Sequence, residues 1–339
     1  MTRRRGGWRV QDPPDVGAPG FRHAAMWYGS PDELLTSTLE FIRAGLAAGE
    51  AVLVASAGPY LQRLRLQVGA GGDRVTWTGM SGAAINPRRI TAAMRGFADE
   101  HRGRPVRLVQ EPAWHLCPPD QLCEAIRHET LVNLALGGSP VTVLCAFDQQ
   151  LASEAVAAVT DTHPLIVRDK RWLPSPSFAA DLPVPRECDQ PLPSPPAGAA
   201  MLTYRHDQAG VRQFTAQQAR LAGLAPERVT DLVIAVGEVA ANTLAHTDGP
   251  GTLWLWSADG VVFCQIHDSG ELSDPLAGSF LPDPGALGGG RGLWVVNQLC
   301  DLVEIRTGPA GTTVRLRVNL APEAPPAARR RRASSTSCR

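Results

Sequence analysis

Residues 226–246 read PERVTDLVIAVGEVAANTLAH, and this stretch decides how the second half of the chain folds. Apolar residues recur along it at three- and four-residue spacing, which predicts an amphipathic helix with its apolar stripe packed inward. Glu238 and Asn242 lie off that stripe, and His246 continues their row. Side chains four residues apart stand about 6 Å from each other on one helical face. A solvated polar face is the ordinary explanation of such a row, so the sequence downstream must decide whether it is a site.

Two predicted strands follow this helix. Residues 252–256 and 261–266 are rich in β-forming residues and are separated by Ser-Ala-Asp-Gly, which is typical of a hairpin. The second strand ends at His267-Asp268-Ser269-Gly270. A carboxylate at a strand end can face a pocket, and a glycine beside it lets a flat ligand approach the backbone closely. Alone, an Asp-x-Gly sequence is equally typical of an ordinary turn.

A glycine-rich turn comes next. Residues 271–287 contain three prolines and several small residues, which predicts a mobile loop. The loop leads into Gly288-Gly289-Gly290-Arg291-Gly292-Leu293, directly before a predicted helix. Free backbone N–H groups and the helix dipole favour an anion such as a phosphate at that position. Arg291 could add a charge-assisted contact.

These elements, in this order, resemble the ATP-binding domain shared by histidine kinases and gyrase, the Bergerat or GHKL fold. The helix motif corresponds to Glu238 through Asn242, the first glycine box to Asp268 through Gly270, and the second to Gly288 through Leu293. A threonine-rich final strand at residues 311–314 also fits. The resemblance covers residues 201–320 and implies an α+β two-layer sandwich. One position departs from the pattern, because Leu272 stands where many members have a second glycine.

The resemblance also implies roles for individual residues. Asn242 would hold Mg2+ against the phosphates, Asp268 would accept a hydrogen bond from the adenine amino group, and Glu238 would be the general base or would orient the nucleophile. The ATP-binding residues implied in this way are Asn242, His246, Asp268, Gly270, Gly288, Gly289, Gly290, Arg291, Gly292, Leu293 and Thr312. Phosphoryl transfer requires held phosphates, a metal that neutralises charge and a base near the incoming hydroxyl, so these residue types suit the chemistry.

Within this superfamily the domain is more similar to anti-sigma-factor serine kinases than to histidine kinases, in the layout of residues 212–214 and 224–229. A histidine kinase needs a phosphorylatable histidine on a helical hairpin just upstream, and the proline-rich segment there contains none. The resemblance therefore implies an ATP-dependent serine/threonine protein kinase that phosphorylates an anti-anti-sigma-like partner and could also bind a sigma factor. Two alternatives stay open: an ATP-binding interaction switch that transfers no phosphate, and a histidine-kinase-like sensor component.

The first half of the chain alternates short β-like runs with helical stretches. We expect strands at residues 51–55, 106–109 and 141–145 and helices near 31–48, 87–101 and 119–136. Such alternation predicts an α/β domain with a mainly parallel sheet covered by helices. Residues 21–28, 107–114 and 143–148, with His128, Glu129 and Asn133, look like the MEDS sensory domain. That resemblance implies a RecA-like fold without a P-loop, and a small-molecule ligand of the hydrocarbon-derivative class.

A sensor pocket is predicted where the strands of such a sheet end, because ligands bind at that edge. The candidate residues are His23, Tyr28, Glu111, Trp114, Glu129 and Asp148. Core packing or capping is the simpler interpretation of each. A metal site built from His115, Cys117, Cys123 and His128 is disfavoured, because their spacing matches no common zinc pattern and two prolines interrupt it.

Composition bounds the remaining possibilities. The 339 residues predict two domains, and 33 basic against 33 acidic residues argue against a protein held to nucleic acid by overall charge. Lys170 is the only lysine and has no glycine near it, which excludes a P-loop. Seven scattered cysteines without a Cys-x-x-Cys pair indicate a reducing compartment. No apolar run approaches the ~18 residues of a spanning helix, so we expect a cytoplasmic protein without a membrane partner; homodimerisation stays open.

A proline-rich segment divides the chain. Eight prolines between Pro174 and Ala199 predict an extended connector that acts as a tether. The basic C-terminal end reads as a solubilising tail. The expected parts are a disordered tail at 1–20, a MEDS-like domain at 21–173, a linker at 174–199, an ATPase-like domain at 200–320 and a disordered basic tail at 321–339.

Overall fold

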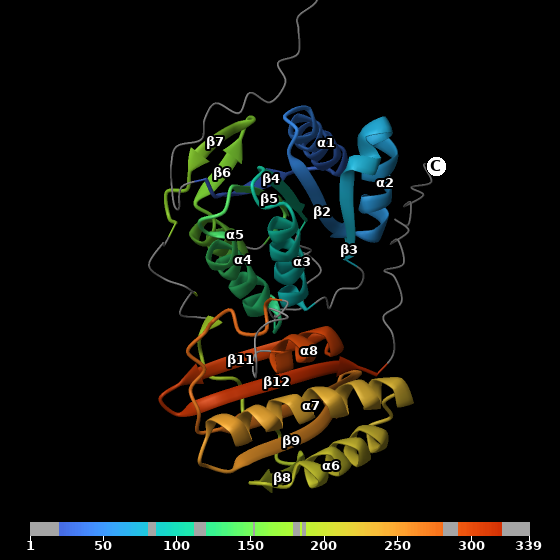
Figure 1. Cartoon of the computed structure of the whole chain (residues 1–339), viewed down its shortest axis with the longest axis vertical. Coiled ribbons are helices and arrows are strands. Elements are labelled where there is room, and N and C mark those ends of the chain that lie inside the picture. Colours follow the sequence, from blue (N-terminus) through green and yellow to red (C-terminus); the bar gives the residue numbers. More distant parts are fainter. Residues whose placement is uncertain are drawn as a thin grey trace, which may run out of the picture.

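The structure is a computed structural model that describes residues 20–80, 86–111, 120–151, 153–178, 184, 188–280 and 291–320. The described residues form two domains stacked along the long axis of the molecule (Figure 1). No described helix is long and apolar enough to cross a membrane. Apart from Gly20, the two predicted tails lie outside the described residues.

A seven-stranded sheet forms the centre of the first domain. Its elements are β1 (Arg22–Tyr28), α1 (Pro31–Ala47), β2 (Ala51–Ala57), α2 (Gly58–Val68), the 3-10 helix η1 (Gly69–Arg74), β3 (Val75–Met80), α3 (Pro87–Glu100), β4 (Val106–Gln110), α4 (Leu122–Leu136), β5 (Val141–Asp148), α5 (Ser153–Thr162), β6 (Leu165–Arg168) and β7 (Arg171–Pro174). The strand order is β3-β2-β4-β5-β1-β6-β7. All neighbouring strands are parallel except β6 and β7, which confirms the predicted α/β class.

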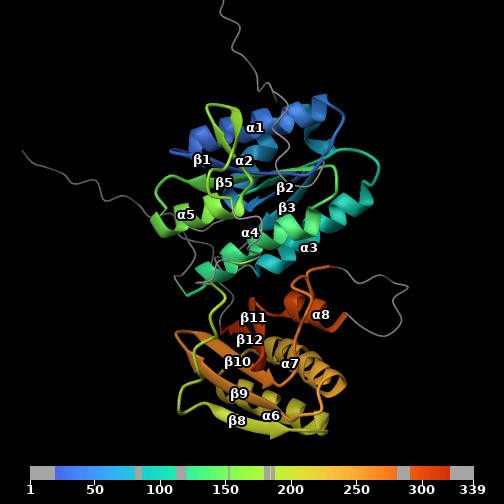
Figure 2. The same ribbon diagram turned by 90° about the vertical axis from the view of Figure 1, so that its left-hand side faces the viewer.

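Helices cover both faces of this sheet (Figure 2). α1 and α2 enclose one apolar core, and α3, α4 and α5 enclose the other. Successive residues of β5 point to opposite cores, so Leu144 joins the α1–α2 core and Cys145 joins the α3–α5 core. The α3–α5 side faces the second domain (Figure 2).

The second domain is a two-layer sandwich. Its elements are β8 (Ala200–Tyr204), α6 (Gln208–Leu221), α7 (Pro226–His246), β9 (Gly251–Ala258), β10 (Val261–Asp268), α8 (Arg291–Leu299), β11 (Leu302–Gly308) and β12 (Gly311–Asn319). The sheet order is β11-β12-β10-β9-β8, all antiparallel. The predicted hairpin turns at Asp259 and Gly260, with φ of 49° and 77°, the left-handed pair that a type I′ turn needs. This order of elements confirms the predicted α+β class.

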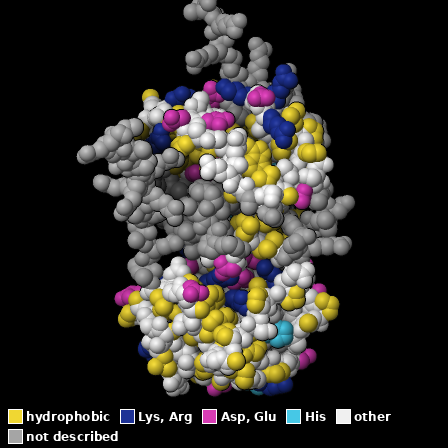
Figure 3. Space-filling model, turned by 180° about the vertical axis from the view of Figure 1, so that it is seen from behind, with side chains coloured by type: hydrophobic (Ala, Val, Ile, Leu, Met, Phe, Trp, Pro, Cys, Tyr) yellow, Lys and Arg dark blue, Asp and Glu magenta, His cyan; other side chains and the backbone are white. Residues whose placement is uncertain are grey.

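The sheet face opposite the helices carries charge and lies against the first domain. Arg306 forms an ion pair of 2.6 Å with Glu124, which is 5% exposed at the start of α4. Arg317 contacts Asp120 of the first domain and Glu304 of its own sheet. Acidic and basic side chains gather at this junction in the space-filling view (Figure 3). Two ionic contacts therefore join the start of α4 to the second sheet.

The second part of the proline-rich linker is anchored. Cys188 is buried and forms a disulfide with Cys123 of α4, with a Cα–Cα distance of 4.9 Å. Arg315 donates a hydrogen bond to the backbone carbonyl of Pro193, and Arg306 donates one to that of Gln190. The expectation of a simple tether is therefore wrong for this part. The disulfide also differs from the fully reduced chain that the scattered cysteines suggested.

Candidate functional site

Helix α7 positions the polar row of the sequence motif. It begins with Pro226 at its first turn and buries its apolar stripe against the sheet. Glu238 and Asn242 lie beside that stripe and are partly exposed, whereas His246 at the end of the helix is exposed. Among the described residues, neither Glu238 nor Asn242 has a side-chain hydrogen-bond partner. Within the part of the chain that the structure describes, their oxygens therefore lack the protein contacts that usually explain such a row.

Both side chains face the beginning of α8. A methyl group at Gly292, the second residue of α8, would lie 2.9 Å from Glu238 Oε2 and 3.6 Å from Asn242 Oδ1. A carboxylate and an amide oxygen thus face the first turn of α8 at Gly292, a residue without a side chain. Such a terminus presents backbone N–H groups suited to an anion, and the two oxygens are ligands that Mg2+ prefers.

Asp268, at the end of β10, contacts α7 through Thr243. Its Oδ2 accepts a hydrogen bond of 2.7 Å from Thr243 Oγ1, and its Oδ1 accepts one of 2.9 Å from the Gly270 N–H. Tyr204 donates to Thr243 at 3.1 Å. Burial and the Thr243 contact act on this phenol in opposite directions, and burial prevails, raising the pKa of Tyr204 to about 12 so that it stays a donor. This chain of donors holds the Asp268 carboxylate in one orientation, partly exposed at the end of β10.

Close contacts with neighbouring atoms explain the glycines around Asp268. A methyl at Gly270 would lie 2.6 Å from Thr247 Cγ2. Gly311 has a φ of 111°, and a methyl there would overlap the Asp268 carbonyl. Thr312 pairs with Asp268 across the sheet and donates a hydrogen bond of 2.8 Å to the Gly270 carbonyl. Thr247, Gly311 and Thr312 therefore hold the first glycine box in place.

The second glycine box is only partly described. Gly288, Gly289 and Gly290 lie outside the described residues, Arg291 is exposed, and Leu293 is partly buried. Leu272, the departure from the family pattern, packs against the core of the second domain and donates its N–H to Thr307 at 2.9 Å. Of the predicted nucleotide residues, the structure brings together Glu238, Asn242 and Gly292 in one group and Asp268, Gly270 and Thr312 in another.

The loop between the two glycine boxes touches the first domain, a contact that sequence reasoning did not find. Residues 271–280, here called the docked segment, place Leu276 and Phe280 against the α3–α5 core. Arg88 at the start of α3 donates to the segment at Ser279 Oγ (3.0 Å), the Ala277 carbonyl (3.2 Å) and the Pro275 carbonyl (3.4 Å). Residues 271–280 of the loop that was expected to be mobile are therefore held against the first domain.

The same end of α3 holds α8. Arg89 donates to the carbonyls of Asn297, Gln298 and Cys300 at 2.6–2.8 Å, which satisfies groups that a helix C-terminus leaves unpaired. Asn86, the N-cap of α3, donates to Asn297 Oδ1 at 2.8 Å, and both side chains are fully buried. Asn297 in turn donates to the Gly278 carbonyl of the docked segment at 3.1 Å.

Comparison with known families agrees with these two architectures. Residues 22–164 match the family described as MEDS, the MEthanogen/methylotroph, DcmR Sensory domain, and residues 203–318 match the histidine kinase-like ATPase domain. The chain carries a MEDS domain followed by a histidine kinase-like ATPase domain. The first match spans β1 to α5 and ends just before β6 and β7, and the second runs from β8 into β12.

One solved structure in the comparison is a crystal structure of the RsbU and RsbW domains of Rv1364c from Mycobacterium tuberculosis. It is 21% identical, the match covers 38% of this chain, and the TM-score is 0.28. The chain spans about a third of that protein's length, 34%. Among curated proteins, none matches the chain.

The predicted sensor residues of the MEDS domain fall into two places. Tyr28, Glu111 and Asp148 lie at or just after the carboxyl ends of β1, β4 and β5. Glu111 is buried and accepts a hydrogen bond of 2.5 Å from Ser56 Oγ; burial raises the pKa of Glu111 and this hydrogen bond partly offsets it. His23 and Glu129 instead lie deep between the sheet and α4 and are fully buried. Trp114 lies outside the described residues.

Two of the four residues considered for a metal site, Cys123 and His128, are described in the structure. Cys123 forms the disulfide to the linker. His128 contacts Thr91 at 2.9 Å and Gln110 at 2.9 Å inside the core. His115 and Cys117 lie outside the described residues. Cys123 and His128 are therefore engaged in different contacts.

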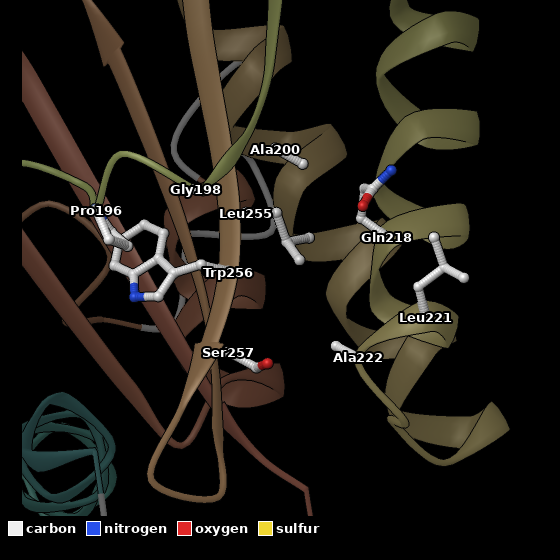
Figure 4. A pocket seen from close by; sticks show the side chains of 9 residues that line it. All are labelled: Pro196, Gly198, Ala200, Gln218, Leu221, Ala222, Leu255, Trp256 and Ser257. Carbon is white, nitrogen blue, oxygen red and sulfur yellow. The ribbon is translucent and has the colours of Figure 1, made fainter.

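The ATPase domain also has an open cavity away from the predicted nucleotide residues. It has a volume of about 430 Å³ between the linker, β9 and α6. Ala200 and Leu255 point toward Gln218 and Leu221 of α6, while Trp256 lies beside Pro196 (Figure 4). The polar side-chain groups of its lining are the Gln218 amide, the Ser257 hydroxyl and the Trp256 indole N–H. None of the lining side chains is charged, so the cavity offers no base or metal ligand for phosphoryl transfer.

Proposed function

We propose that this protein is an ATP-dependent serine/threonine kinase of the anti-sigma-factor type, which phosphorylates an anti-anti-sigma-like partner under control of its MEDS domain. The observation that carries the proposal is the meeting of Glu238 Oε2 and Asn242 Oδ1 at Gly292. A carboxylate that can act as a base and an amide oxygen that can bind a metal ion both face the N-terminus of α8, where the second glycine box ends. The family match to an ATPase domain supports ATP as the nucleotide.

Three residues of the candidate site have proposed tasks in nucleotide binding. Asp268, oriented by Thr243 and the Gly270 N–H, accepts a hydrogen bond from the adenine amino group. Gly270 lets the base approach the strand. Asn242 would hold Mg2+, because carboxylate and amide oxygens such as those of Glu238 and Asn242 are the ligands that this ion prefers. The bound ion would neutralise charge on the phosphates.

Glu238 has the proposed catalytic task. It accepts the proton of a serine or threonine hydroxyl while the hydroxyl oxygen attacks the γ-phosphorus. The new bond joins that oxygen to phosphorus, the bond from phosphorus to the β,γ-bridging oxygen breaks, and ADP leaves with the electron pair. Positioning and electrostatics supply most of the rate in such transfers, so the carboxylate must lie within hydrogen-bond reach of the hydroxyl.

Control by the MEDS domain is proposed to act through α3. Arg88 contacts the docked segment between the two glycine boxes, and Arg89 and Asn86 contact α8, whose first turn lies at Glu238. A ligand that moves α3 would therefore act on both sides of the nucleotide site. The sigma factor and the partner would bind surfaces of the ATPase domain.

The first experiment is calorimetric titration of Mg2+-ATP into the full chain and into Asp268→Asn and Asn242→Ala. We expect the affinity to fall about tenfold or more in each variant, which corresponds to about 1.4 kcal/mol. Asp248→Asn is the matched control, because Asp248 is an exposed carboxylate beyond the end of α7 and should bind ATP like the parent. Equal affinity in all four proteins would overturn the assigned nucleotide site.

The second experiment measures transfer of radiolabelled phosphate to a cognate partner. We expect Glu238→Gln to lose transfer by about 100-fold or more while it keeps nucleotide binding. Glu227→Gln, an exposed carboxylate in the first turn of α7, is the control. ATP binding without transfer by the parent would favour the interaction switch, and an acid-labile, alkali-stable product would favour the histidine-kinase-like alternative.

A further inference from the structure

Four buried side chains of the MEDS domain meet at one point of the α3–α5 core. They are His23 of β1, Glu129 of α4, Cys145 of β5 and His163, which follows α5 directly. All four are 0% exposed, and one ligand atom from each lies within 4.8 Å of all the others. Three of them come from different elements and the fourth from the connection after α5, and the sequence separates them by up to 140 residues (163 − 23).

The hydrogen-bond network directs Nε2 of His23 toward this point, where it lies 3.2 Å from Cys145 Sγ. Asn133 uses its amide N–H groups on the carbonyls of Thr162 (2.7 Å) and Glu129 (3.4 Å), so its oxygen faces His23 Nδ1 at 2.9 Å. His23 Nδ1 therefore carries the hydrogen and donates it to Asn133. In a neutral imidazole the other nitrogen, Nε2, is then an acceptor.

His163 is arranged in the same way. Its Nδ1 lies 2.8 Å from the Val159 carbonyl, which can only accept, so Nδ1 is the donor. Its Nε2 is buried, has no hydrogen-bond partner among the described residues, and lies 3.5 Å from Glu129 Oε2. Donation of one imidazole N–H to a carbonyl or amide, with the other nitrogen left free, is the arrangement found around histidine ligands of metals.

The cluster has more acceptors than donors. His23 Nε2, His163 Nε2 and Glu129 Oε2 all need a partner, and the Cys145 thiol can supply one hydrogen, either to His23 at 3.2 Å or to Glu129 at 3.6 Å. A buried polar atom without a partner costs about 1–3 kcal/mol. A cation at the centre would satisfy all of these atoms together.

We propose that His23, Glu129, Cys145 and His163 bind one divalent transition-metal ion, with zinc as the best fit. Zinc takes nitrogen, sulfur and oxygen ligands at about 2.0–2.3 Å in a tetrahedron, whose edges are then about 3.3–3.7 Å. His23 Nε2 lies 3.2 Å from Cys145 Sγ and 3.5 Å from Glu129 Oε2. Glu129 Oε2 in turn lies 3.5 Å from His163 Nε2 and 3.6 Å from Cys145 Sγ. Four of the six edges thus have nearly the required length.

Charge and ligand type favour this class of ion. Binding releases the thiol proton to solvent, so one thiolate and one carboxylate balance the 2+ charge and the buried site becomes neutral. A sulfur and two imidazole nitrogens suit zinc and its neighbours, not Mg2+ or Ca2+. Four protein ligands leave no open position, which is typical of a structural site. The ion would join β1, β5, α4 and the end of α5, and α4 also carries Glu124, which pairs with Arg306 of the ATPase domain.

The test measures metal content of the full chain, purified without a metal-affinity step, by inductively coupled plasma mass spectrometry. We expect about one zinc per chain, and after chelation about one Zn2+ or Co2+ should rebind and raise the melting temperature. Bound Co2+ should show a thiolate charge-transfer band. A parent protein that contains under about a tenth of an equivalent, and whose melting temperature does not change with added Zn2+, would overturn the proposal; the cluster would then hold a proton instead.

Variants locate the ion. His163→Ala should lose stoichiometric zinc, and Cys145→Ser should lose the charge-transfer band, with folding checked by circular dichroism. Cys264→Ser is the matched control, because Cys264 is also a free, fully buried strand cysteine but lies in the ATPase domain. Asn242→Ala should keep its zinc, which separates this site from the proposed Mg2+ ligand. Full zinc content and an unchanged cobalt spectrum in both cluster variants would overturn the assignment even if the parent protein binds metal.

Discussion

Arg88 of the MEDS domain donates a hydrogen bond of 3.0 Å to Ser279 Oγ in the loop that joins the two glycine boxes of the ATPase domain. Arg88 is 7% exposed, and burial lowers its pKa. The Nη1 donors of this largely buried guanidinium reach across the junction to the docked segment. This contact links the two domains at the part of the ATPase domain where a nucleotide is proposed to bind.

Loss of Arg88 should release the docked segment. Arg88→Ala removes donors to Ser279 Oγ and to the carbonyls of Pro275 and Ala277, and we expect it to lower the free energy of unfolding by about 1–3 kcal/mol. Amide hydrogen exchange should accelerate in residues 271–280. Arg102→Ala is the control, since this exposed arginine pairs with Asp99 and its side chain has no other hydrogen bond or ion pair among the described residues. Unchanged exchange in the Arg88 variant would mean that the contact does not hold the segment.

Gly292 should be necessary for catalysis and unimportant for folding. Its backbone is compatible with alanine, but the added methyl would lie 2.9 Å from Glu238 Oε2 and displace that carboxylate. We expect Gly292→Ala to lower phosphoryl transfer by about 100-fold, because small misplacements of catalytic groups have effects of that size.

Gly237 offers a matched control on α7. A methyl there would meet no atom within 4 Å, so Gly237→Ala should keep its activity and gain up to about 1 kcal/mol of stability from helix propensity. Equal activity of the two glycine variants in the transfer assay would contradict the proposed position of Glu238.

Asn86 and Asn297 should be energetically coupled across the domain junction. Both side chains are 0% exposed, and they share a hydrogen bond of 2.8 Å. In a double-mutant cycle of the two alanine variants, measured by denaturant unfolding, we expect a coupling energy of about 1 kcal/mol. The same cycle on Asn86 and Gln218, which lies on α6, should be additive within about 0.5 kcal/mol. Additivity of the first pair would show that the junction is not a single cooperative unit.

The Cys123–Cys188 disulfide should stabilise the anchored linker. The bond closes a loop with a sequence separation of 65, for which chain entropy corresponds to about 4 kcal/mol. Reductant should therefore lower the melting temperature of the parent protein and of Cys300→Ser, a free buried cysteine used as control. Cys188→Ser should melt lower and show no reductant effect. A parent protein whose melting temperature ignores reductant would show that the bond is absent or contributes nothing.

Much of the fold could be predicted because its signals are local. The apolar stripe of residues 226–246 and the turn at Asp259 and Gly260 act over a few residues, and both reappear in the structure. The alternation of strands and helices in the first half likewise led to the parallel sheet. The contact of Arg88 with the loop could not be predicted, because the partners are 187–191 residues apart and carbonyls carry no sequence signature.

The candidate sites also differ in whether their residues belong to short sequence motifs. Glu238, Asn242, Asp268 and the glycines were selected from the sequence as nucleotide-site candidates, because each belongs to a short motif whose spacing suits the chemistry. Of the buried cluster, His23 and Glu129 were selected for a strand-end pocket, whereas Cys145 and His163 gave no signal. No motif spacing connects these four residues. Parallel pairing of β1 with β5 and of β1 with β6 brings His23 close to Cys145 and to the segment that holds His163, and packing of α4 on the same face of the sheet adds Glu129.

The sequence by itself determined the two fold classes and the nucleotide motifs, because hydrophobic periodicity and glycine spacing are properties of adjacent residues. Only the tertiary structure decided which loop Arg88 holds, that Cys188 anchors the linker to Cys123, and that two imidazoles, a thiol and a carboxylate converge. Those relationships depend on how strands pair and how two domains dock, and these contacts join residues that are far apart in the chain.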